Sequence, residues 1–229
     1  MISPLHDIFN LFYPEQCSIC KNQLVKGEKT ICVSCILDLP VTNFCNLKNN
    51  SVETSFYGRI LVKEATSLFY YQKEGKVQKL IQQLKYKGNQ QIGTVLGDWL
   101  GENMLESERF KEIDCIVKVP LHPNKLKKRG YNQLTKFEHS LSKKLQIPVV
   151  ENVLVKVSAS QTQTKKSRFD RTINVDEKFE LLDTRILENK HILLIDDIIT
   201  TGATLEACSI ALLHSKNLKI SIATMAYTL

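Results

Sequence analysis

The segment ILLIDDIITTGAT, which spans residues 192–204, constrains the fold of this chain more than any other part of its sequence. Four apolar residues predict a buried strand, and Asp196 and Asp197 follow where that strand should end. A threonine-rich turn comes next, and an apolar helical pattern begins behind it. In open α/β sheets ligands bind beyond the carboxyl ends of the strands, so this order of residues predicts a binding site in an α/β protein.

The turn after the two aspartates has the features of a phosphate-binding loop. Gly202 permits a tight turn and lets backbone N–H groups approach a ligand. The expected helix N-terminus adds a positive dipole and free N–H donors, and Thr200, Thr201 and Thr204 add hydroxyl donors. A carboxylate would repel a phosphate, but it can accept hydrogen bonds from two adjacent sugar hydroxyls. The pattern therefore predicts a ligand that carries a diol a short distance from a phosphate, as ribose 5-phosphate does.

Apolar runs and helical hydrophobic patterns alternate along most of the chain. We expect strands at residues 65–72, 113–120, 148–157, 191–195 and 218–229. We expect helices at residues 3–12, 75–87, 90–105, 131–146 and 204–216. This alternation predicts an α/β fold in which helices flank a parallel sheet.

Polar, turn-rich stretches predict the connections and one domain boundary. Residues 46–59 read as a linker, and residues 121–130 and 158–171 read as basic loops. We therefore expect a small N-terminal region at residues 1–50, which holds a helix and paired cysteines, and an α/β domain at residues 51–229.

Two C-x-x-C pairs stand close together near the N-terminus. They are Cys17, Cys20, Cys32 and Cys35. This spacing fits a tetrahedral structural Zn²⁺ held by four thiolates, with Gly27 at a turn between the pairs. A redox dithiol is the alternative, but a redox C-x-x-C usually stands alone near a βαβ unit. We interpret Cys45, Cys115 and Cys208 as buried or incidental thiols.

Two polar segments carry clusters of positive charge beside expected strands. Residues 118–133 contain Lys125, Lys127, Lys128 and Arg129, and residues 158–171 contain Lys165, Lys166, Arg168 and Arg171. Pyrophosphate is a dense anion that needs cations and backbone donors around it. Each segment reads equally well as a solvated basic turn, so charge alone leaves both interpretations open.

The sequence resembles a known family at several points. Residues 192–204 look like the phosphoribosyl-pyrophosphate (PRPP) motif of the type I phosphoribosyltransferases: an apolar strand, two acids and a T-T-G-x-T-like loop. P-L-H-P…R-G-Y-N-Q, Q-T…K-K-S-R-x-x-R-x-x-N-V and that loop occur in the same order in the ComF family of competence-associated phosphoribosyltransferase-like proteins. The cysteine module and L-K-Y-K-G, residues 84–88, also resemble that family, so the resemblance covers about residues 14–228.

The resemblance implies a type I phosphoribosyltransferase-like parallel sheet with a small N-terminal zinc module, and it assigns roles within the motifs. The catalytic pair that holds the ribose hydroxyls would be Asp196 and Asp197. The PRPP-binding loop would add Thr200, Thr201, Gly202, Ala203 and Thr204. The pyrophosphate loop, where Mg²⁺ joins the diphosphate, would contain Pro120, Leu121, His122 and Arg129. The flexible loop that excludes water would contribute Gln163, Lys165, Arg168 and Arg171. The same signatures include Asn132, Gln133 and Asn174.

The expected partners follow from the same resemblance. It implies PRPP and single-stranded DNA, together with competence proteins such as a helicase or uptake proteins. A net charge of +7 is compatible with an anionic partner. Tyr86, Tyr131 and Phe169 lie beside basic residues and could stack on bases, although packing in the core is the favoured role for each.

Other functions stay open beside this one. A nucleobase salvage phosphoribosyltransferase would need a base-recognition surface where the cysteine module stands, and a non-catalytic PRPP-sensing regulator would share the same fold. A glutamine amidotransferase is excluded, because Ile2 stands where a catalytic N-terminal cysteine is required. No apolar run approaches the roughly 20 residues of a membrane helix, and the first residues lack the features of a signal peptide. We therefore expect a cytoplasmic protein without membrane insertion.

Overall fold

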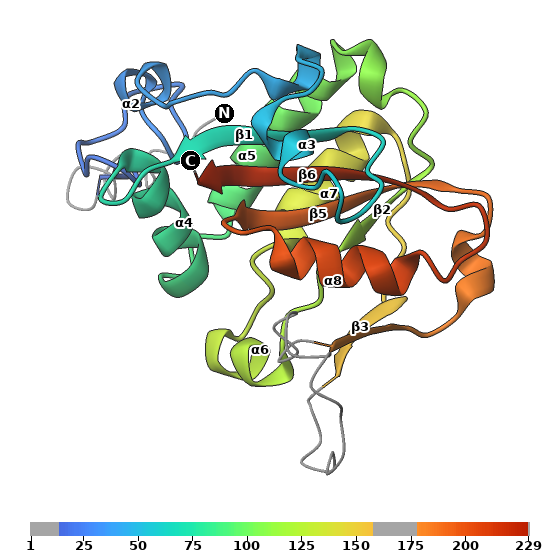
Figure 1. Cartoon of the computed structure of the whole chain (residues 1–229). Helices are drawn as coiled ribbons and strands as arrows, with labels where there is room; N and C mark the ends of the chain where they lie inside the picture. Colours follow the sequence, from blue (N-terminus) through green and yellow to red (C-terminus); the bar gives the residue numbers. More distant parts are fainter. Residues whose placement is uncertain (1–13, 158–177, 229) are drawn as a thin grey trace.

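Four parallel strands form the central sheet of the computed structural model, which describes residues 14–157 and 178–228. In spatial order they are β1 (Ala65–Tyr71), β6 (Lys219–Thr228), β5 (His191–Ile199) and β2 (Cys115–Lys118). Every neighbouring pair is parallel, and β5 lies between β6 and β2 in the interior of the sheet (Figure 1). The predicted α/β fold with a parallel sheet is confirmed.

Helices cover both faces of this sheet. One face carries α4 (Lys76–Tyr86), α5 (Gln91–Leu105) and α7 (Thr135–Leu145), and the other carries α8 (Ala203–Leu212). Alternate residues of β5 serve the two faces, as strand geometry requires. Leu193 and Ile195 pack with α4, α5 and α7, whereas Ile192 and Leu194 pack with α8. All four helices were expected from the sequence.

The strand that carries the two aspartates is longer than predicted. We expected it to end at residue 195, but β5 continues through Asp196 and Asp197 to Ile199. Its parallel pairing with β6 persists over these residues, with Asp196 opposite Thr224 and Ile198 opposite Ala226. The expected end was wrong because the backbone ladder depends on a partner strand and not on the polarity of the side chains.

Residues 46–59 do not form the predicted linker. They contain α3 (Ser51–Thr54), which packs on the α8 face of the sheet through the fully buried side chains of Val52 and Phe56. The buried side chain of Asn50 caps this helix by accepting from the N–H groups of Val52 and Glu53 at 3.0 and 3.2 Å. The asparagine that looked like a turn residue is thus a helix N-cap.

Residues 121–130 were expected to be a basic loop, but most of them form α6 (Pro123–Arg129). Pro123 occupies the first turn, and Nδ1 of His122 accepts a hydrogen bond from the N–H of Asn124 at 3.1 Å. Gly130 ends the helix with a φ of +75°. None of its residues is buried, so the helix lacks the apolar stripe that would have predicted it.

A second, two-stranded sheet stands apart from the first. It pairs β3 (Leu154–Val157) antiparallel with β4 (Lys178–Leu181). The strand expected at residues 148–157 is therefore shorter than predicted and lies outside the main sheet, although Val149 makes one parallel bridge to Ile116. The remaining short elements are α2 (Val33–Leu37), η1 (Phe44–Asn46), η2 (Glu108–Phe110) and η4 (Thr184–Leu187).

The cysteine-bearing segment packs against the same face of the sheet as α4 and α5. Ile19, Ile31 and Leu39 belong to one hydrophobic cluster with Leu80 of α4 and Leu96 of α5. The helix expected at residues 3–12 and the loop expected at residues 158–171 lie outside the described residues. Every helix in the described part of the chain is too short or too polar to cross a membrane.

Candidate functional site

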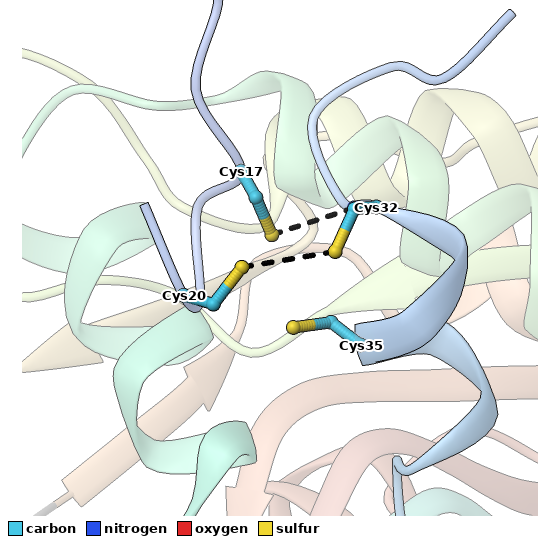
Figure 2. A group of neighbouring side chains, drawn as sticks. All are labelled: Cys17, Cys20, Cys32 and Cys35. Atoms are coloured by element: carbon cyan, nitrogen blue, oxygen red, sulfur yellow. Dashed lines mark hydrogen bonds between the residues drawn. The ribbon is translucent and has the colours of Figure 1, made fainter. Parts of the chain in front are cut away.

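Four cysteine side chains converge in the N-terminal segment. The Sγ atoms of Cys17, Cys20, Cys32 and Cys35 all lie within 4.8 Å of one another. Figure 2 shows the sulfurs turned toward a common point. The first pair comes from the turn at residues 17–20, whereas Cys32 caps α2 and Cys35 lies inside that helix. The sequence prediction that the two pairs meet is confirmed.

The four thiols of this cluster differ in acidity, and together they could hold a metal ion. Burial alone would raise the pKa of Cys17, but hydrogen bonds from the backbone at Cys32, Cys20 and Ile19 outweigh it and lower the pKa to about 6. Burial and the neighbouring thiols raise the pKa of Cys35 to about 12. The thiolate is therefore favoured at Cys17 and the neutral thiol at Cys35. A metal cation would stabilise the thiolate form of all four cysteines. The donor set can hold a metal ion, and four sulfurs are the ligands that Zn²⁺ prefers in structural sites.

The other three cysteines have the simple environment that we expected. Cys45, Cys115 and Cys208 are all buried free thiols. They come from η1, β2 and α8, and within the described residues they are not part of the cluster that the other four cysteines form.

A second polar centre surrounds Asp197 on β5. Its carboxylate is buried and accepts two hydrogen bonds from other elements. Nζ of Lys85, in the last turn of α4, lies 2.8 Å from Oδ1, and Nε2 of Gln133, just before α7, lies 2.7 Å from Oδ2. Both oxygens are thus engaged, and the carboxylate joins α4 and α7 to the end of the sheet.

Asp196 belongs to the opposite face of the same strand. Successive side chains of a strand alternate, so Asp196 shares its face with Leu194 and hence with α8. It is half-buried, and its Oδ1 accepts a hydrogen bond from the N–H of Asp197 at 2.8 Å. The two acids therefore stand on different sides of the sheet rather than side by side.

The L-K-Y-K-G and R-G-Y-N-Q signatures meet in space. The hydroxyl of Tyr131 donates to the carbonyl oxygen of Leu84 and accepts from the N–H of Gly88 at 3.2 Å. Arg129 donates to Oε1 of Gln133 at 2.6 Å and lies over the ring of Tyr86, with 5.2 Å between the guanidinium carbon and the ring centroid. Two motifs more than 40 residues apart thus form one network around Asp197.

The loop after β5 turns directly into α8. Gly202 caps this helix with a φ of +75°, and a Cβ added there would lie 3.0 Å from the ring of Phe56. Both the backbone angle and the space therefore require glycine. The side chains of Thr200 and Thr201 are exposed, and the N–H of Ala203 donates to Oγ1 of Thr201 at 3.4 Å.

Arg59 holds this loop from the α3 side. It donates to the carbonyl oxygen of Thr201 at 2.9 Å, and its Nε donates to Glu206 of α8 at 2.9 Å. The pair neutralises a carboxylate in the first turn of α8, where a negative charge would oppose an incoming phosphate. Sequence analysis missed Arg59 because it lies in the segment that was interpreted as a linker.

Two of the four residues expected to bind pyrophosphate line a separate cavity. Pro120 and Leu121 help to line a cavity of about 360 Å³, which also includes Lys118, Asn132 and Lys156. His122 is engaged as the cap of α6, and Arg129 at the other end of that helix turns toward Gln133. Of the four residues, Pro120 and Leu121 therefore line this cavity, whereas His122 and Arg129 make contacts at the two ends of α6. The predicted loop residues Gln163, Lys165, Arg168, Arg171 and Asn174 lie outside the described part of the chain.

This chain is similar to one protein-family model and to several competence and DNA utilization proteins. Residues 136–228 match the family model described as a phosphoribosyl transferase domain. The chain is 26% identical over 211 residues to Competence protein F of Haemophilus influenzae, which covers 86% of this chain and 90% of that protein. It is 26% identical over 216 residues to the DNA utilization protein YhgH of Escherichia coli, with coverage of 93% and 90%.

Two further similarities are more distant. Competence protein ComFC of Bacillus subtilis is 25% identical over 201 residues, which cover 86% of this chain and 78% of that protein. The solved structure of the glutamine PRPP amidotransferase from Bacillus subtilis aligns with a TM-score of 0.38 and 20% identity, over 57% of this chain and 25% of that one.

Proposed function

This chain belongs to the ComF family of the type I phosphoribosyltransferase superfamily, and on that premise we propose that it binds PRPP with Mg²⁺, binds single-stranded DNA and takes part in DNA uptake. The observation that carries the PRPP proposal is the end of β5. There, an acid engaged by two other elements, a second acid on the α8 face and a glycine-capped phosphate loop follow one another within nine residues, 196–204.

The loop from Thr200 to Thr204 receives the 5-phosphate. Backbone N–H groups at the start of α8 and the exposed hydroxyls of Thr200 and Thr201 are suited to phosphate oxygens. Arg59 supports this role because it fixes the carbonyl of Thr201 and neutralises Glu206.

The two acids have different roles in the proposed site. Asp196 stands on the face of β5 that carries α8, so it is the acid on the phosphate-loop side and accepts from the ribose hydroxyls. Asp197 is held by Lys85 and Gln133, so it orients the end of the strand and the signatures around it. We thus retain both acids in the site but assign them different tasks.

The diphosphate of PRPP lies toward the carboxyl end of β2. Pro120 and Leu121 leave that strand, and α6 presents Lys127, Lys128 and Arg129 in its last turn. Mg²⁺ suits this position because it prefers oxygen ligands and keeps most of its waters when it binds a diphosphate. We propose that residues 163–174 complete the site, as the family resemblance implies.

The DNA role follows from the relatives. They are named as competence and DNA utilization proteins, and the resemblance extends over nine-tenths of the chain in one of them. The net charge of +7 supports an anionic partner but does not identify it.

Calorimetric titration with PRPP and Mg²⁺ tests the central proposal. Asp196→Asn should weaken PRPP binding by at least about tenfold, because it removes a charged acceptor of sugar hydroxyls. Asp183→Asn, which changes the half-buried carboxylate at the N-cap of η4, serves as the matched control and should bind like the wild type. Equal affinity in all three proteins, with unchanged circular dichroism, would exclude Asp196 from the site.

A second assay separates the proposed function from base salvage. Pyrophosphate release is followed while PRPP is offered with each common nucleobase. We expect no turnover across this panel, since a cysteine cluster stands in the N-terminal segment where a salvage enzyme would need a base-recognition surface. Turnover with one base would favour the salvage enzyme instead.

A further inference from the structure

A groove lies between the first cysteine turn and the outer face of α4. Its cavity measures about 380 Å³. One wall consists of Ser18, Ile19 and Lys21, and the other consists of Lys79, Gln82, Gln83, Tyr86 and Lys87. Nothing in the proposed PRPP site uses these side chains, so the groove needs an explanation of its own.

The fold builds this groove from two rigid walls. On α4, residues 79, 82, 83 and 86 recur at spacings of three and four, so they share one face of the helix. The buried residues Val77, Leu80 and Leu84 hold the opposite face against the core. On the other wall, Oγ of Ser18 accepts a hydrogen bond from Nδ2 of Asn89 at 2.9 Å, which ties the cysteine turn to the segment after α4.

The lining has the composition of a nucleic-acid surface. Of the described residues that line the groove, three carry exposed ammonium groups and none carries a carboxylate. These are Lys21, Lys79 and Lys87. Gln82 and Gln83 add amide groups that can both donate and accept hydrogen bonds. A phosphate backbone that follows the groove would meet positive charge from both walls.

Tyr86 supplies the remaining element of such a surface. We expected it to pack in the core, but its side chain is 67% exposed at the edge of the groove. Arg129 already lies over the ring, at 5.2 Å from the centroid. An exposed aromatic ring supported by a cation is the platform on which unpaired bases stack in proteins that bind single strands. Tyr131, by contrast, uses its hydroxyl to fasten Leu84 and Gly88.

We propose that this groove binds single-stranded nucleic acid, with phosphates at Lys21, Lys79 and Lys87 and one base stacked on Tyr86. The proposal rests on the DNA role proposed above and gives that role a location. A single strand fits better than a duplex, because stacking on Tyr86 requires a base that is not already enclosed between its neighbours.

The groove also touches the PRPP site through one chain of contacts. Tyr86 lies under Arg129, Arg129 donates to Gln133, and Gln133 donates to Asp197. Lys85, the neighbour of Tyr86 on α4, pairs with the same carboxylate. A strand stacked on Tyr86 therefore touches the ring that packs on Arg129. Arg129 is linked through Gln133 to Asp197 at the end of β5.

Fluorescence anisotropy with a labelled oligothymidylate tests the groove on the whole 229-residue chain. Tyr86→Ala should weaken binding by about tenfold, whereas Tyr86→Phe keeps the ring and should bind like the wild type. Lys79→Gln with Lys87→Gln should lower the slope of log affinity against log salt by about 1.4, since two phosphate contacts are lost. Lys48→Gln with Lys143→Gln removes two exposed charges outside the groove and should leave both quantities nearly unchanged.

The outcomes separate this proposal from the one it rests on. If the wild-type protein binds no oligonucleotide, both the groove and the DNA role are wrong. If it binds but all the variants bind equally well, only the groove is wrong and the strand lies elsewhere. A hairpin duplex of matched length is the further control. If both the wild type and Tyr86→Ala bind the hairpin with the same affinity as the single strand, the stacking proposal is also wrong. PRPP titration of the lysine variants should match the wild type, because those residues lie outside the PRPP site.

Discussion

At the residue scale, Asp197 decides how the site is assembled. A buried carboxylate is costly unless hydrogen bonds and an opposite charge compensate for its lost hydration. Lys85 and Gln133 provide that compensation from two different elements. The carboxylate therefore joins α4, the start of α7 and the end of β5. The cost of burying it is compensated only when all three elements are in place.

Lys85→Met tests this junction. The change leaves the Asp197 carboxylate, whose side chain is only 8% exposed, without its cation. We expect the free energy of unfolding in urea to fall by on the order of 3 kcal/mol, as for other broken buried pairs. Lys144→Met breaks an exposed pair with Glu102 and should cost much less. Similar losses in the two variants would show that the Lys85–Asp197 pair is no more than a surface contact.

His191 predicts how stability changes with pH. It is buried at the start of β5, where its Nε2 lies 2.8 Å from Oγ of Ser221. Burial, assisted by the charge of Lys63, lowers the pKa of this imidazole below its ordinary value. Below that ordinary value the unfolded chain binds a proton that the folded chain refuses, so acid favours unfolding.

The measurement is the Tm at pH 7 and at pH 5. His191→Gln should lower the Tm at pH 7 modestly but should lose less on acidification than the wild type, because it removes one group that binds protons only after unfolding. The comparison of slopes isolates His191 from the carboxylates, which both proteins share. Parallel losses would mean that another group controls the acid response.

At the element scale, the crossing of α5 and α7 depends on glycines spaced four residues apart. A Cβ added at Gly97 would lie 2.7 Å from the carbonyl oxygen of Phe137 and from Cβ of Ser140. A Cβ added at Gly93 would lie 3.2 Å from the backbone nitrogen of Phe137 and 3.3 Å from Cβ of Lys136. The absence of a side chain at Gly97 therefore sets how closely the two helices approach. A methyl group is tolerated better at Gly93 than at Gly97.

Gly97→Ala should destabilise the protein although alanine is the better helix former. The backbone contact at Phe137 leaves little room to adjust, so we expect a cost of about 2–3 kcal/mol from the forced separation of α5 and α7. This exceeds the roughly 1 kcal/mol that alanine gains in helix propensity. Urea unfolding should show a clear loss for Gly97→Ala and a smaller one, or a gain, for Gly93→Ala. A stabilised Gly97→Ala variant would show that the helices can move apart at little cost.

The sequence predicted elements well where an apolar face repeats and poorly where polar side chains make the decisive contacts. Val77, Leu80, Ile81 and Leu84 marked α4 correctly, because burial dictates their spacing. Polar Asn50 and His122 concealed α3 and α6, since each forms a cap that reads like a turn. Lys85 went unassigned for a related reason. Its partner lies 112 residues away, so no local pattern connects the two.

At the scale of the whole molecule, the cysteine cluster is part of the core. Cys17, Cys32 and Cys35 belong to the hydrophobic cluster that includes Leu80 of α4 and Leu96 of α5. The division expected at residue 50 stays a prediction. Even so, the shared cluster indicates that the two regions support each other. A metal ion bound by the four cysteines would add its binding energy to the folding of both.

Metal removal tests this dependence. We propose Zn²⁺ as the bound metal, and a strong chelator should then lower the Tm of the full chain by several degrees in a single transition. Substituting Cys20→Ser, the exposed member of the cluster, should reproduce the shift without chelator. Two separate transitions, or an unchanged Tm with metal content confirmed at zero, would contradict a shared core.

The strand order has a consequence for biosynthesis. β1 pairs only with β6 in the main sheet, and β6 is the last strand of the fold to leave the ribosome. Residues 40–42 already pair with β1 through the Val41–Phe69 bridge, but the edge of β1 that β6 covers stays open until β6 is made. An open strand edge is the kind of surface on which nascent chains aggregate. The insertion of one late strand between β1 and β5 then completes the sheet, so a chain that stalls before β6 is made would be recognised by chaperones as unfinished.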